Sequence, residues 1–438
     1  MRCSLQDIFV QHFPAYAATR KLHPRQHRAA RCISQCYSPA LGSHLLQCPE
    51  GHYERVQAHA CHHRSCPRCA EPARSRWIDS QLLRLLPCTH FHTVFTLPHE
   101  LLALWAYNRA LMTELLFTSA RDSLLQIMAD PRRLGVMPGL LMSLHTWGRN
   151  LSYHPHLHCL VTAGGLDDNS RWKSSRSHVP ISAFPLRRLF RGKFLSRLGA
   201  LLSQQQLSLP PEQDRSYWRS LIRALYRIDF NVDVGDVYEH GRGVALYLAR
   251  YVKGGPLPKD RPLYLDGTTV RFEFTDHRDH RIKSQSLLVH QFLDRILWHA
   301  PPKGQHLTRY AGLYSSARQS HHLLAQDALL QQSTVRWPRS THSQTSPPPL
   351  PPESPRCPHC KLSLLRTLRP RTHHDGEISL SPTLRALAGS IPPAQPPPRR
   401  CPTTSLKLTR AGGQRPAAEG PLQYHPSAAG RWPPARAT

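Results

Sequence analysis

The sequence predicts an α+β protein in which an antiparallel sheet with flanking helices lies between a small cysteine-rich domain and a disordered tail. Seven of the 12 cysteines lie between Cys32 and Cys88, which marks the first of these parts. The apolar segments 139–147 and 154–162 flank a polar turn and predict an antiparallel hairpin. Of the 41 prolines, 21 lie from Pro338 onward, where too few apolar residues remain to form a core.

The N-terminal part divides into a helical lead-in over residues 1–44 and the cysteine-rich domain over 45–88. The apolar anchors of the lead-in are Leu5, Ile8 and Phe9. Apolar residues between Trp77 and Leu86 recur at helical spacing, and Pro87 ends that helix.

Residues 89–320 are expected to form the central domain, and the hairpin lies in its sheet. Runs of β-branched and aromatic residues, or alternating polarity, predict further strands over 92–98, 229–237 and 268–274. Apolar residues at helical spacing predict helices over 101–128, 184–226, 243–252 and 286–299. The disordered tail is placed at 341–438, where its basic residues are expected to add only nonspecific electrostatic affinity.

The chain carries 57 Lys and Arg residues against 28 Asp and Glu, a formal charge of +29. This surplus indicates a polyanionic partner, in the first place nucleic acid, because each neutralised phosphate releases counterions. The alternative explanation of the surplus is nonspecific adhesion of the kind that ribosomal proteins show, or a basic disordered tail. No apolar run approaches the ~18–20 residues that cross a bilayer, and no secretory signal is recognisable. We therefore expect no membrane partner and a cytoplasmic, DNA-associated protein.

Cysteines and histidines with metal-ligand spacing cluster in the 45–88 domain. The turn Cys66-Pro-Arg-Cys69 places two thiolates on one Zn²⁺ ion, and a tetrahedral site needs two more ligands. Cys48, His52 and Cys61 compete for these two positions, so the sequence predicts one zinc ion per chain. The ion acts either as a structural support alone or also in bringing the domain onto DNA.

Three histidines alternate along the second strand of the hairpin, in His154-Pro-His156-Leu-His158. Side chains alternate across a strand, so all three share one face while Leu157 packs behind. Two imidazoles spaced in this way can bind a divalent cation and leave positions open for a phosphate oxygen. His145 on the partner strand, or His154, is a candidate third ligand, and a solvated polar face is the alternative.

Two tyrosines, Tyr247 and Tyr251, lie one helical turn apart in the predicted helix 243–252. Such a pair commonly serves packing, but beside a metal-bound phosphate a tyrosine oxygen can form a phosphotyrosine bond. The sequence has no phosphate-binding loop of the ATPase type, and strand transfer of this kind needs no nucleotide cofactor. Basic residues expected to contact DNA are Arg187, Arg188, Arg191, Lys193, Arg250 and Lys253.

Together these motifs resemble the rolling-circle transposases of the insertion sequence 91 family, which belong to the His-hydrophobic-His endonuclease superfamily. The resemblance runs from about Leu45 to Gln319. It rests on Ser65-Cys-Pro-Arg-Cys69, Val94-Phe-Thr-Leu-Pro98, Leu144-His-Thr-Trp-Gly148, His154-Pro-His-Leu-His158, Phe190-Arg-Gly-Lys-Phe194 and Tyr247-Leu-Ala-Arg-Tyr-Val252.

The resemblance implies a transposase that nicks and rejoins single-stranded DNA at transposon ends. His156 and His158 would bind catalytic Mg²⁺ or Mn²⁺, and Tyr247 and Tyr251 would be the nucleophiles. The family often has Cys-x-x-Cys-Gly where this chain has Cys48-Pro-Glu-Gly-His52, which leaves the zinc ligands open.

Three further interpretations remain open beside this one. A histidine-triad nucleotidyl hydrolase also carries alternating histidines, but it needs neither the cysteine cluster nor paired tyrosines. A zinc-containing protein that binds DNA without cutting it is the second alternative, and a replication initiator or relaxase with the same chemistry is the third. The late pair Cys357-Pro-His-Cys360 resembles half of a second zinc site, but the sequence shows no partners for it, and we expect it to be inert.

Overall fold

The structure, a computed structural model, describes residues 1–175, 179–238, 249, 254–276, 279–302, 304–332 and 355–369. These residues form two compact units, each built from two separate parts of the chain. The first unit contains 1–36 and the described residues from 61 to 332, and the second contains 37–60 and 355–369. No helix among the described residues is long and apolar enough to cross a membrane.

The first unit contains a five-stranded antiparallel sheet in the order β13-β5-β6-β4-β9. Its strands are β4 (His90–Thr96), β5 (Gly139–Trp147), β6 (Tyr153–Thr162), β9 (Val232–Tyr238) and β13 (Thr308–Gly312). The predicted hairpin is confirmed as β5 and β6, whose register places His145 opposite His156 and Ser143 opposite His158.

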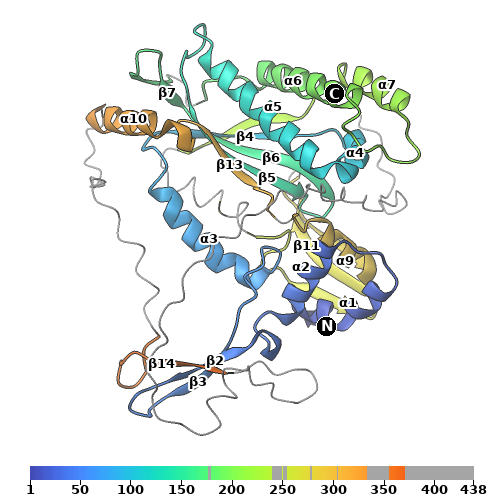
Figure 1. The fold of residues 1–438 in the computed structure, drawn as a ribbon, viewed down its shortest axis with the longest axis vertical. Helices are drawn as coiled ribbons and strands as arrows, with labels where there is room; N and C mark the ends of the chain where they lie inside the picture. Colours follow the sequence, from blue (N-terminus) through green and yellow to red (C-terminus); the bar gives the residue numbers. More distant parts are fainter. Residues whose placement is uncertain are drawn as a thin grey trace, which may run out of the picture. The chain divides into compact units, whose positions relative to one another are not determined.

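One face of this sheet is apolar and covered by helices. Phe91, Phe95 and Leu157 point to that face, where they join the largest buried cluster. Figure 1 shows helices α5 and α6 side by side over it. The covering helices are α4 (Leu102–Tyr107), α5 (Arg109–Ala129), α6 (Ala183–Ser203) and α7 (Arg215–Leu225), with a 3₁₀ turn η2 (His99–Leu101) before α4.

The other face of the sheet carries the histidines and a smaller apolar cluster. Leu141 and Leu160 point to this face and pack with Trp77 and Tyr314. The helices that contribute to the cluster are α3 (Pro67–Leu82) and α10 (Gln319–Gln332). The short hairpin β7 (Gly164–Leu166) and β8 (Trp172–Ser174) also contributes to it, and the 3₁₀ turn η3 (Ser316–Arg318) precedes α10.

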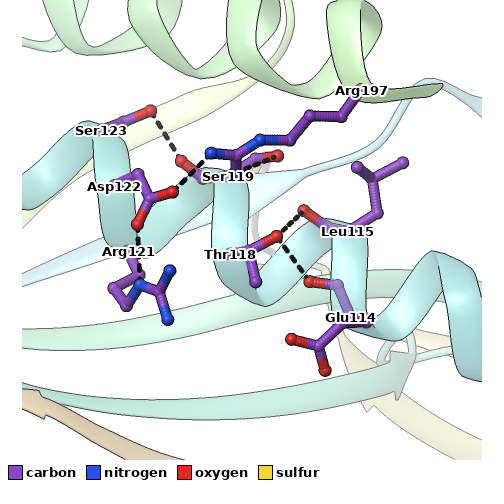
Figure 2. Close-up of polar contacts among 8 residues, drawn as sticks. All are labelled: Glu114, Leu115, Thr118, Ser119, Arg121, Asp122, Ser123 and Arg197. Carbon is purple, nitrogen blue, oxygen red and sulfur yellow. Dashed lines mark hydrogen bonds and ion pairs between the residues drawn. The ribbon is translucent and has the colours of Figure 1, made fainter. Parts of the chain in front are cut away.

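A polar network joins α5 to α6 above the apolar face. Figure 2 shows the guanidinium of Arg197 on α6 reaching the carboxylate of Asp122 and the hydroxyl of Ser119 on α5. Arg121 also contacts Asp122, with Nε 2.7 Å from Oδ1. Partial burial opposes ionisation of Asp122, but the hydrogen bonds from Arg121 and Arg197 prevail and lower its pKa.

Replacing Asp122 by Asn should therefore lower the free energy of unfolding by about 1 kcal/mol at pH 7, because the Arg197 contact loses its charge. The folded pKa lies below the unfolded value, so this contribution is full above pH ~4 and disappears as the pH falls through the folded pKa. Chemical denaturation of parent and variant at pH 7 and pH 3 checks this expectation. Equal losses at both pH values would contradict it.

A second sheet of the first unit packs against a helix that also contacts the two N-terminal helices. Its strand order is β1-β10-β11-β12, and α1, α2 and α9 lie against one another. The Tyr16 hydroxyl on α1 donates to Asp294 Oδ1 on α9 over 2.6 Å. The bounds are β1 (Arg2–Cys3), α1 (Leu5–Ala18), α2 (Pro24–Gln35), β10 (Leu263–Asp266), β11 (Thr269–Thr275), β12 (Ile282–Leu288) and α9 (Val289–Trp298).

The second unit is a small three-stranded antiparallel sheet in the order β14-β2-β3. Its elements are η1 (Pro39–Leu41), β2 (Ser43–Gln47), β3 (Glu54–Ala58) and β14 (Leu365–Arg369). β14, the orange-red strand of Figure 1, pairs with β2 although more than 300 residues separate them. This strand lies inside the segment 341–438, for which the sequence predicts disorder, so structure and prediction differ there.

The predicted class, a mixed fold of helices and antiparallel sheets, is confirmed. The helical segments predicted over 101–128 and 184–226 each form two helices, α4 and α5 in the first and α6 and α7 in the second. Strands β10, β12 and β13 and helix α10 were not predicted. The predicted helix 243–252 lies outside the described residues except for Ala249, which is helical and buried.

Candidate functional site

Three histidines converge on the polar face of the large sheet. His145 lies on β5, His156 and His158 lie on β6, and one ring nitrogen of each lies within 4.8 Å of the others. The strand alternation that sends Leu157 into the apolar cluster sends the histidines to the opposite side. Imidazoles that converge in this way fit a divalent cation, since ligands of one ion must lie close together.

Hydrogen bonding fixes the proton of one of these rings. His156 Nδ1 lies 2.6 Å from the carbonyl oxygen of His154, which can only accept, so Nδ1 donates. The Nε2 lone pair of His156 is therefore left for a metal. Burial, reinforced by His154, lowers the pKa of His156 to about 3. Burial beside His145 lowers the pKa of His158 well below its ordinary value, so both rings are neutral at pH 7.

A fourth histidine, His92 on the neighbouring strand β4, contacts this group and was not predicted as a site residue. Its Nε2 lies 2.9 Å from Nδ1 of His158, and the two rings stack with centroids 5.1 Å apart. This contact holds the Nδ1 side of the His158 ring and so orients its Nε2. Most metal-binding imidazoles are oriented in this way, by a hydrogen bond to the ring nitrogen that does not bind the metal. His92 begins the strand predicted over 92–98, and the alternation His90-Phe-His92 was the signal that could have found it.

His154, the other candidate for the third ligand position, lies at the exposed start of β6. Its ring centroid is 5.2 Å from that of His156, but it does not belong to the converging group. His145 is the histidine that the sheet register brings opposite His156.

The predicted nucleophiles Tyr247 and Tyr251 lie outside the described residues, as do Arg250 and Lys253. Ala249, which stands between the tyrosines in the sequence, is described. It is fully buried in the apolar cluster on the histidine face of the sheet.

The predicted DNA-contacting residues on α6 lie over the opposite face of the sheet, because Phe190 and Phe194 of this helix pack into the apolar cluster there. Arg187 and Arg191 both pair with Asp229, at 3.7 Å and 3.1 Å. The remaining two predicted residues, Arg188 and Lys193, are exposed and partly exposed. Contact of this helix with DNA remains a prediction.

A second cluster of the first unit consists of four cysteines, Cys36, Cys61, Cys66 and Cys69. Cys69 Sγ lies 3.5 Å from Cys36 Sγ and 3.6 Å from Cys61 Sγ. Two thiolates on one tetrahedral zinc ion lie about 3.8 Å apart, because each Zn–S bond is about 2.3 Å long. The four sulfur atoms therefore fit a structural zinc ion.

The turn that carries Cys66 and Cys69 runs directly into α3. Cys66 is the N-terminal cap of that helix, and Pro67 occupies its first position. A hydrogen bond from Cys61, opposed by burial and supported by the amide N–H groups of Cys69 and Arg68, lowers the pKa of Cys66 to about 5. A thiol that ionises at neutral pH can bind zinc directly, because the thiolate is the form that binds the metal.

The structure divides the five predicted zinc ligands between two groups. Cys61, Cys66 and Cys69 lie with Cys36, which the sequence analysis counted in the cluster but did not choose. The ligand atoms of Cys48 and His52 lie instead, within the second unit, beside those of Cys357 and Cys360. Cysteines from outside the 45–88 segment complete both groups, Cys36 in the first and Cys357 and Cys360 in the second. Two groups of four therefore stand where the sequence predicts a single ion.

Comparison with known proteins identifies the class. A family model described as a transposase zinc-binding domain matches residues 8–97, and one described as a putative transposase matches residues 139–321. The histidine cluster and the tyrosines fall within the second match, and the cysteines of the first unit's cluster fall within the first. The site thus belongs to a DNA transposase.

Two relatives narrow the identification. A putative transposase, y4qJ, of Sinorhizobium fredii is 34% identical over 313 residues, which cover 70% of this chain and 79% of the relative. The transposase for insertion sequence element IS801 of Pseudomonas savastanoi pv. phaseolicola is 38% identical over 283 residues. That match covers 63% of this chain and 65% of the relative, just under two thirds of its length. No solved structure matches the chain. The chain belongs to the insertion sequence 91 family of transposases.

Proposed function

We propose that this transposase nicks and rejoins single-stranded DNA at transposon ends through phosphotyrosine intermediates, in rolling-circle transposition. The observation that carries the proposal is the convergence of His145, His156 and His158 on one face of the sheet. Mg²⁺ or Mn²⁺ bound there would polarise the scissile phosphate. The tautomer of His156 and the neutral state of His156 and His158 suit this role.

In the proposed reaction the oxygen of Tyr247 or Tyr251 attacks the phosphorus. A bond forms between that oxygen and phosphorus, and the bond from phosphorus to the 3′ oxygen of the DNA breaks. The phenol loses its proton and the 3′ oxygen gains one, so the products are a 5′ phosphotyrosine and a free 3′ hydroxyl. The second tyrosine accepts the next strand in the same way, and the free 3′ hydroxyl rejoins DNA by the reverse reaction.

The support for the two nucleophiles comes from their spacing and from the family. Residues four apart on a helix share one face, so both hydroxyls would reach one metal centre in turn.

Incubation with single-stranded oligonucleotides carrying transposon ends, with and without Mn²⁺, tests the proposal. A covalent protein–DNA adduct that appears only with the metal is the expected result. DNA binding without any adduct would favour a protein that binds ends and does not cut. Release of free nucleotides without an adduct would favour the histidine-triad hydrolase.

We also propose that Cys36, Cys61, Cys66 and Cys69 hold the structural zinc of the first unit. The change Cys36→Ser should remove this ion or weaken its binding by at least about tenfold, since a neutral hydroxyl replaces a thiolate. Competition with a chromogenic zinc chelator measures the effect. Cys32→Ser, one helical turn away and outside the group, is the matched control and should behave like the parent. Equal zinc affinity of the two variants would contradict the assignment.

A further inference from the structure

We propose a second zinc site in this protein, formed by Cys48, His52, Cys357 and Cys360. The ligand atoms of these four residues lie within 4.8 Å of one another, in the second unit. The two late cysteines lie outside both segments that the transposase family models match. The inference does not depend on the proposed strand-transfer chemistry.

The distances within the group suit a metal ion and do not suit a disulfide. Cys48 Sγ lies 3.4 Å from Cys360 Sγ and 3.9 Å from His52 Nδ1. A disulfide requires about 2.05 Å between sulfur atoms. A tetrahedral zinc ion places two thiolates about 3.8 Å apart and a thiolate about 3.5 Å from an imidazole nitrogen. The observed sulfur–sulfur separation is slightly shorter than the value for zinc ligands, and the observed sulfur–nitrogen separation is slightly longer.

Two tight turns present the ligands. In the first, the Gly51 N–H donates to the Cys48 carbonyl over 3.0 Å, and the Cys48 N–H donates to Tyr53 over 2.8 Å. In the second, the N–H of Cys357 donates to the carbonyl of Leu362 over 2.8 Å. These bonds close each turn at the base, so its ligands point to the same side.

Backbone amides also support the thiolates. The N–H of Lys361 donates to the carbonyl of Cys357 over 3.0 Å, and this bond closes the second turn on the side of the Cys357 sulfur. Burial opposes ionisation of Cys357, but the N–H groups of Cys360 and His359 prevail and lower its pKa. The same turn, Cys-Pro-x-Cys, carries Cys66 and Cys69 in the first unit.

The second unit needs such a support because its apolar core is very small. The core consists of Leu46, Leu364, Cys48 and Cys357, and Tyr53 and Cys360 pack against it. The described part of the unit has about 40 residues, and domains of that size usually require a metal or disulfides to fold. Two of the four buried core residues, Cys48 and Cys357, are thus ligands of the proposed zinc ion.

The site has a consequence for the architecture. It holds β14 against β2, so two segments that lie about 300 residues apart in the sequence, 37–60 and 355–369, form one domain around one ion. Three thiolates and one imidazole are a common ligand set of structural zinc. Cys48 and His52 then keep a zinc-binding role, and Cys357 and Cys360 supply the ligands that a single N-terminal site lacks.

Zinc content of the full-length protein, purified under reducing conditions without chelator, tests the proposal. Elemental analysis should find about two zinc ions per chain for the parent and about one for the double variant Cys357→Ser/Cys360→Ser. His359→Ala lies in the same turn but outside the ligand group, and it should retain both ions. A double variant with as much zinc as the parent would overturn the proposal.

If the double variant does not fold, a variant of His52 tests whether the second zinc site exists. His52→Cys should keep both ions and add a thiolate ligand. In the cobalt-substituted protein, the thiolate-to-cobalt absorption should then rise, because eight thiolates bind cobalt in place of seven. His52→Ser should instead lose one ion. An unchanged cobalt spectrum in His52→Cys would show that residue 52 is not a ligand and would overturn the site.

Discussion

His156→Ala and His158→Ala are each expected to reduce cleavage of single-stranded DNA by at least about 100-fold at millimolar Mn²⁺. Each change removes one of the imidazoles that converge on the polar face of the sheet. Fewer ligands hold a weakly bound cation less well against water, and the phosphate then loses its polarising charge. Initial rates of oligonucleotide cleavage over a range of Mn²⁺ concentrations measure the loss.

The matched control for these two variants is His99→Ala. The His99 side chain is 84% exposed and lies outside the histidine group, so its loss should leave the rate within about twofold of the parent. Cleavage by His156→Ala and His158→Ala at the parent rate would show that the cation does not bind there. Partial rescue by higher Mn²⁺ would instead support a site with weakened affinity.

The second large effect concerns the tyrosines. A phenol with an ordinary pKa near 10 is a poor nucleophile at pH 7 and needs the metal-bound phosphate to react. Tyr247→Phe and Tyr251→Phe remove only a hydroxyl. Each single variant should lose complete strand transfer, while at least one of them still forms a covalent adduct. The double variant should form none.

Gel analysis of adducts with labelled oligonucleotides separates these outcomes. Binding of the same oligonucleotides by the double variant should equal that of the parent, which shows that the protein is folded. An adduct that persists in the double variant would mean that another residue is the nucleophile.

Local patterns of the sequence were enough to predict the centre of the fold. The hairpin of β5 and β6 combines long apolar strands with a polar turn, and its alternation placed His156 and His158 on one face opposite Leu157. By contrast, β12 is mostly exposed and therefore has little apolar alternation to detect. The edge strand β13 is short and ends at Gly312, so it also carries a weak signal.

The metal-ligand sets could be predicted only in part, because sequence spacing identifies ligands within one turn and not the turns that meet in space. Cys66 and Cys69 were found from their turn, whereas Cys36 joins them from the end of α2. Cys357 and Cys360 had the right spacing but no partner nearby in the sequence. Pairing of β14 with β2 brings that partner, and no local rule predicts such a long-range pairing.

Mapping the DNA-linked residue is the most direct test of the proposed strand-transfer chemistry. The parent protein is allowed to react with a single-stranded transposon end in Mn²⁺, the adduct is digested with protease and nuclease, and the modified peptide is sequenced by mass spectrometry. We expect a nucleotide attached through phosphate to Tyr247 or Tyr251. A nucleotide on any other residue, or an adduct formed equally well without a divalent cation, would contradict it.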